Sequence, residues 1–125
     1  MEPPAENRRR ILLADDYPAM MRALERLLTP DYDVVGQVAD GGAVVEAAVR
    51  LQPDLVIVDL HMPNMGGLEA CRRIRRELPQ TKVILLTATG DEVIAESALA
   101  SGASAYVVKY RLGHDLLPAI EKSLA

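Results

Sequence analysis

Short aliphatic runs alternate with amphipathic stretches five times along this chain. Runs that are apolar almost throughout are typical of parallel strands covered on both faces, and the stretches between them have helical periodicity. The alternation predicts an α/β domain in which helices cover both faces of a parallel sheet. The predicted strands span residues 10–14, 33–39, 55–59, 82–87 and 105–108, and the predicted helices span residues 18–29, 42–51, 67–78, 91–101 and 113–124.

Proline, glycine and aspartate residues mark the ends of these segments. Pro18 falls in the first turn of its helix, where a missing N–H is tolerated. Asp91 is placed to begin the fourth helix near its positive end, and Gly102 to cap its C-terminal end. Pro118 conflicts with the pattern, because it falls inside the last amphipathic stretch. That helix is therefore predicted to begin late, near residues 115–117, or to kink there.

Length and composition indicate one globular domain. The chain has 125 residues, half of them apolar, and a single cysteine, Cys71, which excludes an internal disulfide. The net charge of −4 gives no electrostatic signature of nucleic-acid binding, and no apolar stretch approaches the ~20 residues of a membrane span. We therefore expect a cytoplasmic protein that binds neither nucleic acid nor membrane, with a flexible lead-in at residues 1–9 and one domain over residues 10–125.

Chemically active side chains follow or end four of the predicted strands. They are Asp15 and Asp16 after the first, Asp59 at the end of the third, Thr87 at the end of the fourth and Lys109 after the fifth. In doubly wound folds the carboxyl ends of the strands form one edge, and ligands bind there. Three carboxylates gathered at that edge repel one another, and a divalent cation is an effective way to keep them ionised together.

This set of residues predicts a metal-assisted phosphoryl acceptor. Asp59 is the predicted nucleophile, because it ends the strand expected at the centre of the sheet and a carboxylate can form an acyl phosphate. The predicted Mg²⁺ ligands are Asp15, Asp16, Asp59 and the backbone carbonyl of His61, with Asp16 the stronger candidate for direct ligation.

The hydroxyl and the ammonium complete this prediction. Lys109 is predicted to pair with Asp59 at rest and with a phosphoryl oxygen afterwards, and Thr87 to donate its hydroxyl to another phosphoryl oxygen. Each residue alone has an ordinary explanation: either of the adjacent aspartates could cap a helix, and Lys109 could be a solvated charge. Their combination at one edge favours a common site.

Four strings of sequence also resemble a known family. In chain order they are LLADD (Leu12–Asp16), VIVDLHMPNMGG (Val56–Gly67), LLTA (Leu85–Ala88) and ASAYVVK (Ala103–Lys109). Their order and spacing resemble the receiver domain of response regulators in bacterial two-component systems, from about Arg10 to the end of the chain. The string YDVVGQVADG (Tyr32–Gly41) is similar to receivers that precede a LuxR/FixJ-type DNA-binding domain.

The resemblance implies a flavodoxin-like (βα)5 three-layer sandwich with a five-stranded parallel sheet in the order 2-1-3-4-5. It implies that a sensor histidine kinase phosphorylates Asp59 with Mg²⁺, and that Thr87 and Tyr106 form the switch. The face made by the fourth helix, fifth strand and fifth helix would then change, forming a homodimer or contacting another partner. The output would be transcription through a DNA-binding domain absent from this chain, and the receiver would not be an enzyme beyond weak self-phosphorylation and self-dephosphorylation at Asp59.

The chain departs from the family pattern at Tyr110. Receivers commonly have a proline after the lysine, often preceded by a cis peptide bond, whereas Tyr110 follows Lys109 here. A cis bond before a residue other than proline costs roughly 3 kcal/mol, so we expect a trans bond or a strained cis bond at this position.

Two other functions remain open from the sequence. A phosphatase with an aspartyl nucleophile usually has a second acid two residues later, where this chain has His61. A flavin-binding module of the same topology needs a phosphate-binding loop after the first strand, where Asp15 and Asp16 would repel a phosphate. The sequence also leaves open whether the chain is a complete protein or one domain of a longer regulator.

Overall fold

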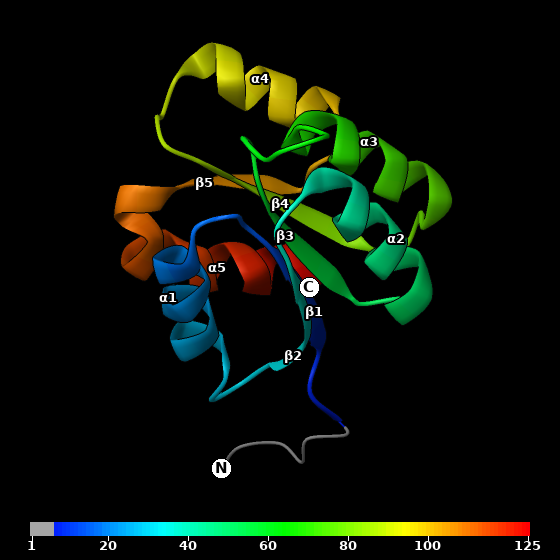
Figure 1. The fold of residues 1–125 in the computed structure, drawn as a ribbon. Helices are drawn as coiled ribbons and strands as arrows, with labels where there is room; N and C mark the ends of the chain where they lie inside the picture. Colours follow the sequence, from blue (N-terminus) through cyan, green and yellow to red (C-terminus); the bar gives the residue numbers. More distant parts are fainter. Residues whose placement is uncertain (1–6) are drawn as a thin grey trace.

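The computed structural model describes residues 7–125, in which strands and helices alternate along the chain (Figure 1). The predicted lead-in therefore lies largely outside the described residues. The strands are β1 (Arg10–Ala14), β2 (Asp33–Val38), β3 (Leu55–Asp59), β4 (Lys82–Thr87) and β5 (Ala105–Val108). The helices are α1 (Pro18–Leu28), α2 (Gly41–Leu51), α3 (Gly67–Glu77), α4 (Glu92–Ala100) and α5 (Leu112–Leu124), with a short 3-10 helix, η2 (Lys109–Arg111), before α5.

The five strands form one parallel sheet in the order β2-β1-β3-β4-β5, which confirms the predicted fold. β3 lies at the centre, between β1 and β4. Its register pairs Val58 with Ala14 of β1 and Asp59 with Leu86 of β4. The carboxyl ends of β1 and β3 are therefore level with each other, as a site at this edge requires.

Alternate residues of the strands point into two separate hydrophobic clusters. Ile11 and Leu13 of β1 pack with α1 and α5 on one face of the sheet, whereas Leu12 and Ala14 pack against α2 and α3 on the other. The two groups of helices lie on opposite sides of the sheet in Figure 1. This two-residue alternation explains the long apolar runs of the inner strands β1, β3 and β4, since both of their faces are covered.

Aspartate and glycine residues define helix ends as their chemistry predicts. The Asp91 carboxylate accepts a hydrogen bond of 2.8 Å from the Val93 N–H and caps α4, and Asp40 caps α2 in the same way through Ala43. Gly102 follows α4 with φ of +101°, a conformation that favours glycine.

The predicted late start of the last helix is wrong. α5 begins at Leu112 and continues through Pro118 to Leu124. Pro118 cannot donate the helical hydrogen bond to the carbonyl of His114, but both residues are exposed, so water can satisfy that carbonyl. Leu116 and Ile120, on the other side of the helix, are fully buried against the sheet. Packing of this apolar face stabilises a helix that local propensity alone would interrupt.

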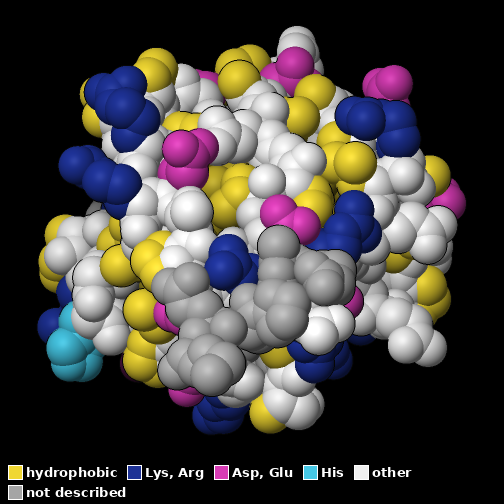
Figure 2. Space-filling view, turned by 90° about the horizontal axis from the view of Figure 1, so that it is seen from below, with side chains coloured by type: hydrophobic (Ala, Val, Ile, Leu, Met, Phe, Trp, Pro, Cys, Tyr) yellow, Lys and Arg dark blue, Asp and Glu magenta, His cyan; other side chains and the backbone are white. Residues whose placement is uncertain are grey.

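The surface carries mixed charge. On the face drawn in Figure 2, basic and acidic side chains are interspersed among hydrophobic ones, apart from the part covered by grey atoms. None of the described helices is long and apolar enough to cross a lipid bilayer.

Candidate functional site

The acidic residues singled out in the sequence meet at the carboxyl edge of the sheet. Asp15 follows β1 and Asp59 ends the neighbouring strand β3, so the parallel register places them side by side. Asp15 is 2 % exposed and Asp59 is 5 % exposed, whereas Asp16 is exposed to solvent. Oxygen atoms of the three carboxylates lie within 4.8 Å of one another. The site is thus a small acidic pocket in which Asp15 and Asp59 are buried, and Asp16 lies on the side that is open to solvent.

Lys109 joins the two buried carboxylates. Its Nζ lies 3.0 Å from Asp15 Oδ2 and 3.2 Å from Asp59 Oδ2. The predicted pairing of Lys109 with Asp59 is therefore present, and the contact with Asp15 is an addition that the sequence did not indicate. The lysine comes from the start of η2 after the edge strand β5, so its long side chain must cross the end of β4 to reach β3.

Burial and mutual repulsion perturb the charges of this cluster. Burial raises the pKa of Asp59, the neighbouring Asp15 raises it further, and Lys109 offsets only part of the rise. Burial opposes the charge of Lys109 as well, but its contacts with Asp15 and Asp59 outweigh that effect, so the pKa of Lys109 is raised. Asp59 is therefore held in an environment that penalises its negative charge.

The carboxylate oxygens of Asp15, Asp16 and Asp59 suit a divalent cation that prefers oxygen ligands. Asp15 Oδ2 is buried and, apart from its ion pair with Lys109, has no hydrogen-bond partner among residues 7–125. A buried carboxylate oxygen held by a single ammonium can still bind a divalent cation. Asp16 offers a carboxylate on the exposed side, where ligand waters of Mg²⁺ can be accommodated.

Thr87 ends β4 beside this pocket, but its hydroxyl is engaged within its own loop. Thr87 Oγ1 donates to the carbonyl of Thr89 over 3.0 Å and accepts from the Thr89 N–H over 3.2 Å. Tyr106 lies on β5, half-buried against the hydrophobic cluster on the α2 and α3 face. The two predicted switch residues therefore lie on the adjacent strands β4 and β5, with no described hydrogen bond from either to Asp59.

Comparison with known proteins assigns the chain to a family. The sequence model of the response regulator receiver domain matches residues 11–121. The chain belongs to this receiver family. Its relatives include the nitrate/nitrite response regulator NarL of Escherichia coli K12, 34 % identical over 117 residues, which are 92 % of this chain and 54 % of NarL. Another is the transcriptional regulatory protein LiaR of Bacillus subtilis, 36 % identical over 113 residues, which are 89 % of this chain and 54 % of LiaR.

Solved structures agree with this assignment. A LuxR-family response regulator from Aurantimonas sp. SI85-9A1 superposes with a TM-score of 0.88 at 35 % identity, covering 94 % of this chain and 86 % of that one. The receiver domain of a NarL response regulator from Mycobacterium tuberculosis superposes with a TM-score of 0.85 at 30 % identity, covering 92 % and 94 %. The receiver spans about half the length of the curated relatives it matches.

His61 and Tyr110 occupy the loops around the pocket of this receiver. The His61 side chain is exposed, and its backbone N–H approaches Asp59 Oδ1 at 3.5 Å. The peptide bond between Lys109 and Tyr110 is trans, because the described residues contain no cis bond. The trans alternative of the sequence prediction is therefore the observed one.

Two glycines that position the pocket were not singled out from the sequence. A Cβ on Gly67 would lie 2.4 Å from the carbonyl oxygen of Asp59, and one on Gly41 would lie 1.9 Å from the carbonyl oxygen of Met65. Both glycines begin helices, so the first turns of α3 and α2 pack directly on the loop after β3. The sequence signal available was glycine in the first turn of a helix, where a residue of higher helix propensity would normally be favoured.

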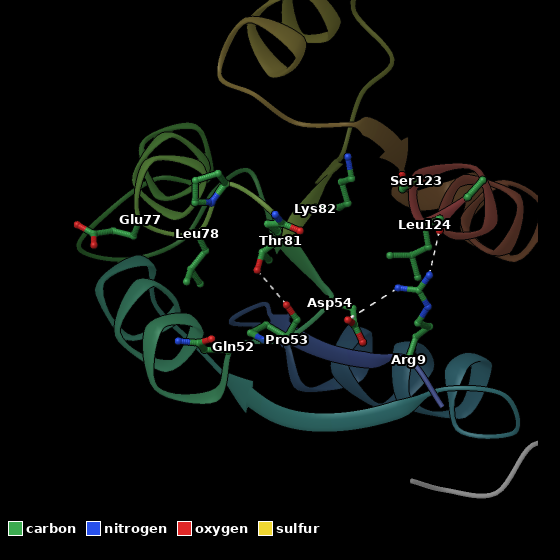
Figure 3. Close-up of a pocket in the computed structure, with 13 residues that line it drawn as sticks. Arg9, Gln52, Pro53, Asp54, Glu77, Leu78, Thr81, Lys82, Ser123 and Leu124 are labelled. Carbon is green, nitrogen blue, oxygen red and sulfur yellow. Dashed lines mark hydrogen bonds and ion pairs between the residues drawn. The ribbon is translucent and has the colours of Figure 1, made fainter. Parts of the chain in front are cut away.

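A second hollow lies at the opposite edge of the sheet. This cavity, of about 390 Å³, lies near the amino ends of β3 and β4. Figure 3 shows its lining residues, among them Arg9, which contacts Asp54 and the carbonyl of Leu124. Thr81 closes one wall by donating its hydroxyl to the Pro53 carbonyl. Because parallel strands separate their two ends by their full length, this cavity is remote from the acidic pocket.

Replacing Asp59 with asparagine is expected to stabilise the receiver in metal-free buffer at neutral pH. Because folding raises the pKa of Asp59, its ionised form costs folding free energy. That cost is absent below the pKa of the unfolded carboxyl and is complete above the raised pKa of the folded one. We therefore expect Asp59→Asn to raise Tm by a few degrees at pH 7.5 in EDTA, with the gain shrinking toward pH 4.

Thermal unfolding followed by circular dichroism measures this difference. The matched control is Asp31→Asn, which removes an exposed carboxylate outside the pocket and should leave Tm nearly unchanged. A lower Tm for Asp59→Asn than for the wild type at pH 7.5 would show that the pair with Lys109 outweighs the burial of Asp59.

Proposed function

We propose that this receiver accepts a phosphoryl group on Asp59 from a sensor histidine kinase and acts as a phosphorylation-controlled switch. One observation carries the proposal: Asp15, Asp16 and Asp59 share one pocket, and Lys109 contacts the two buried acids. A structural ion pair would need one acid and one base. Three acids with a single ammonium leave an excess of negative charge that suits a cation and a transferred group.

The proposed reaction is displacement at phosphorus by the Asp59 carboxylate. An Asp59 oxygen forms the new P–O bond, the P–N bond of the phosphohistidine breaks, and its electron pair stays on the imidazole nitrogen. Transfer converts the Asp59 carboxylate, whose charge burial penalises, into an uncharged acyl group, and the negative charge of the product lies on the phosphoryl oxygens, near the open side of the pocket. Lys109 remains ionised because its pKa is raised, and it stabilises charge on those oxygens.

The same pocket would hold the cofactor. We assign Mg²⁺ to Asp15, Asp16 and Asp59, with the backbone carbonyl of His61 as a further ligand. The ion would supply positive charge against the phosphoryl oxygens. In this proposal the chain is a switch and not primarily an enzyme, since its only catalysis is slow self-phosphorylation and self-dephosphorylation at Asp59.

The switch would begin at Thr87. Its hydroxyl now donates to the carbonyl of Thr89, and after phosphorylation it would donate to a phosphoryl oxygen on Asp59 instead. That exchange moves the end of β4 and alters the space beside Tyr106 on β5, the neighbouring strand. The tyrosine is half-buried, so it can turn further into the core when that space opens.

The proposed readout surface is the face formed by α4, β5 and α5. Val93 is 68 % exposed and Leu99 is 57 % exposed on α4, and Ala98 is the only fully buried residue of that helix. A helix with this much exposed apolar surface suits a partner interface. We propose a homodimer contact here, which phosphorylation strengthens or weakens.

The output is proposed from the relatives. The receiver covers about half of NarL and LiaR, and LiaR is named a transcriptional regulatory protein. We propose that transcription is the regulated process, through a DNA-binding domain that the receiver controls without binding DNA itself. A cytoplasmic location accompanies this proposal.

Intact mass spectrometry tests the proposed function. The receiver is incubated with acetyl phosphate and Mg²⁺, and Asp59→Asn is treated identically. We expect one phosphoryl group on the wild type, none on Asp59→Asn, and none on the wild type when EDTA replaces Mg²⁺. A phosphoryl group that survives the substitution would refute the assignment of the nucleophile, and one that forms in EDTA would refute the assignment of the metal.

A further inference from the structure

The exposed aromatic side chains of this chain are concentrated beside the acidic pocket. The chain has four tyrosines and neither phenylalanine nor tryptophan. Tyr32 and Tyr106 are half-buried, whereas Tyr17 is 67 % exposed and Tyr110 is 78 % exposed. Single exposed apolar residues are ordinary on protein surfaces. Here, however, both exposed rings immediately follow pocket residues, since Tyr17 comes after Asp16 and Tyr110 after Lys109.

Contacts with Asp15 fix the backbone at or beside both tyrosines. The Tyr17 N–H donates to Asp15 Oδ1 over 2.8 Å, and Tyr17 begins α1 in an extended conformation. Tyr110 lies in η2. Lys109, the first residue of η2, contacts Asp15 Oδ2, the second oxygen of the carboxylate that binds the Tyr17 N–H. The loop after β1 and the η2 segment both contact Asp15, one through a backbone N–H and the other through the Lys109 ammonium. Asp15 therefore links the two segments that carry the rings.

A phosphoryl donor must reach Asp59 from the exposed side of the pocket. Asp59 is 5 % exposed, so an incoming phosphorus atom can approach only from the open side of the pocket. In an in-line displacement the leaving atom lies beyond the phosphorus, on the side away from the nucleophile. The leaving group of a histidine donor is an imidazole ring, which would be placed outside the pocket, at the level of the two tyrosines.

We propose that Tyr17 and Tyr110 form an aromatic rim that receives the imidazole ring of a phosphohistidine donor. Planar rings associate by offset or edge-to-face contacts, and tyrosine provides a rigid ring at low conformational cost. This inference rests on the proposed function and adds to it the residues that select the donor. The rim would favour a planar azole leaving group over acetate, which has no ring to stack.

Two small donors separate ring recognition from phosphorylation itself. Monophosphoimidazole carries the leaving ring of phosphohistidine, and acetyl phosphate delivers the same phosphoryl group without a ring. The rate of phosphorylation of Asp59 is measured by intact mass with each donor and Mg²⁺, and the ratio of the two rates is compared among variants. In both cases the bond to phosphorus breaks with its electron pair on the leaving group, imidazole or acetate, so the chemistry at Asp59 is shared.

The variants keep or remove the planar ring. We expect Tyr17→Leu/Tyr110→Leu to lower the ratio of the imidazole rate to the acetyl rate by about two- to tenfold, the range of an aromatic contact. Tyr17→Phe/Tyr110→Phe should keep the wild-type ratio, because the ring remains. Val49→Ala, an exposed apolar residue on α2, is the matched control and should also keep the ratio.

Each result decides the inference. An unchanged ratio in the leucine variant, with both donors active, would overturn the aromatic rim while the proposed function stands. An equal fall with both donors would overturn it too, since the rings would then support the pocket without recognising the donor. If neither donor phosphorylates the wild type, the proposed function and the rim both fail.

Discussion

Replacing Lys109 with methionine is expected to slow the phosphorylation of Asp59 by at least about 100-fold, the usual effect of removing a fixed group that stabilises charge in a transition state. Lys109 contacts Asp15 and Asp59 at 3.0 and 3.2 Å, and its side chain is only 21 % exposed. A mobile solvent cation cannot reproduce a charge held in that place. Intact mass against time, with acetyl phosphate and saturating Mg²⁺, measures the change.

Lys109→Met is also expected to lower the free energy of unfolding of the metal-free receiver by about 2 kcal/mol. This is less than the usual cost of breaking a fully buried ion pair, because the lysine is partly exposed. The raised pKa of Lys109 means that its stabilising contribution is complete below the ordinary lysine pKa and is lost as pH rises through the folded value. At low pH the contribution also disappears, because the carboxylates become protonated. The loss of stability in Lys109→Met, relative to the wild type, should therefore be largest near neutral pH and smaller near pH 4.

Lys82→Met is the matched control for both measurements. Lys82 is a half-buried lysine at the amino end of β4, and its side chain lines the remote cavity of Figure 3. We expect this variant to be phosphorylated at nearly the wild-type rate. If Lys109→Met were phosphorylated as fast as Lys82→Met, the role of Lys109 in charge stabilisation would be wrong.

The fold could be predicted from the sequence because β1, β3 and β4 are buried on both faces and give clear apolar runs. Four of the five predicted strands have the predicted bounds, and the fifth, 33–39, ends one residue earlier at Val38. The helix ends differ from the predicted bounds by at most one residue, where capping decides the boundary. The continuation of α5 through Pro118 could not be predicted, because the cost of Pro118 is local and visible in sequence, whereas the packing of Leu116 and Ile120 on the sheet is not.

That the side chains of the site would meet at one edge of the sheet was predictable for a different reason. Parallel strands bring their carboxyl ends to one edge, so Asp15, Asp59 and Lys109 meet wherever the strand assignment is correct. The second contact of Lys109, with Asp15, depends on the path of one long side chain across β4. The bonds between Thr87 and Thr89 depend on a loop conformation. Neither has a periodic signal in the sequence.

Contacts of glycine were also invisible in the sequence, because the close approach of two backbone segments leaves no pattern of side chains. The pattern predicted Gly67 only as the first residue of a helix and Gly41 only as the residue before one, with no sign of the loop after β3 that packs against both. They matter because that loop begins directly after Asp59, so its position determines where the predicted acceptor lies.

Replacing Gly67 with alanine is accordingly expected to cost about 3 kcal/mol of stability, at the upper end of the usual range for overpacking. Its Cβ would lie 2.4 Å from the carbonyl oxygen of Asp59 and 2.8 Å from Leu60 Cα, and both atoms are backbone that cannot rotate away. The hydrogen bond of 2.9 Å from the Gly67 N–H to the Leu60 carbonyl would be strained by the same movement. At about 4 °C per kcal/mol for a domain of this size, the expected fall in Tm exceeds 10 °C.

Gly42→Ala is the matched control, because Gly42 also lies in the first turn of a helix but has room for a methyl group. The nearest atom to its added Cβ is Asp40 Oδ1 at 3.5 Å, an ordinary contact, so alanine should stabilise α2 by about 0.5 kcal/mol. Thermal unfolding of the two variants should therefore give shifts of opposite sign. Since Gly67→Ala moves the backbone of Asp59 and Gly42→Ala does not, only the first should also slow phosphorylation by acetyl phosphate when assayed below its Tm. Equal Tm values for the two variants would mean that the loop after β3 yields easily, and that Gly67 does not fix the position of the acceptor.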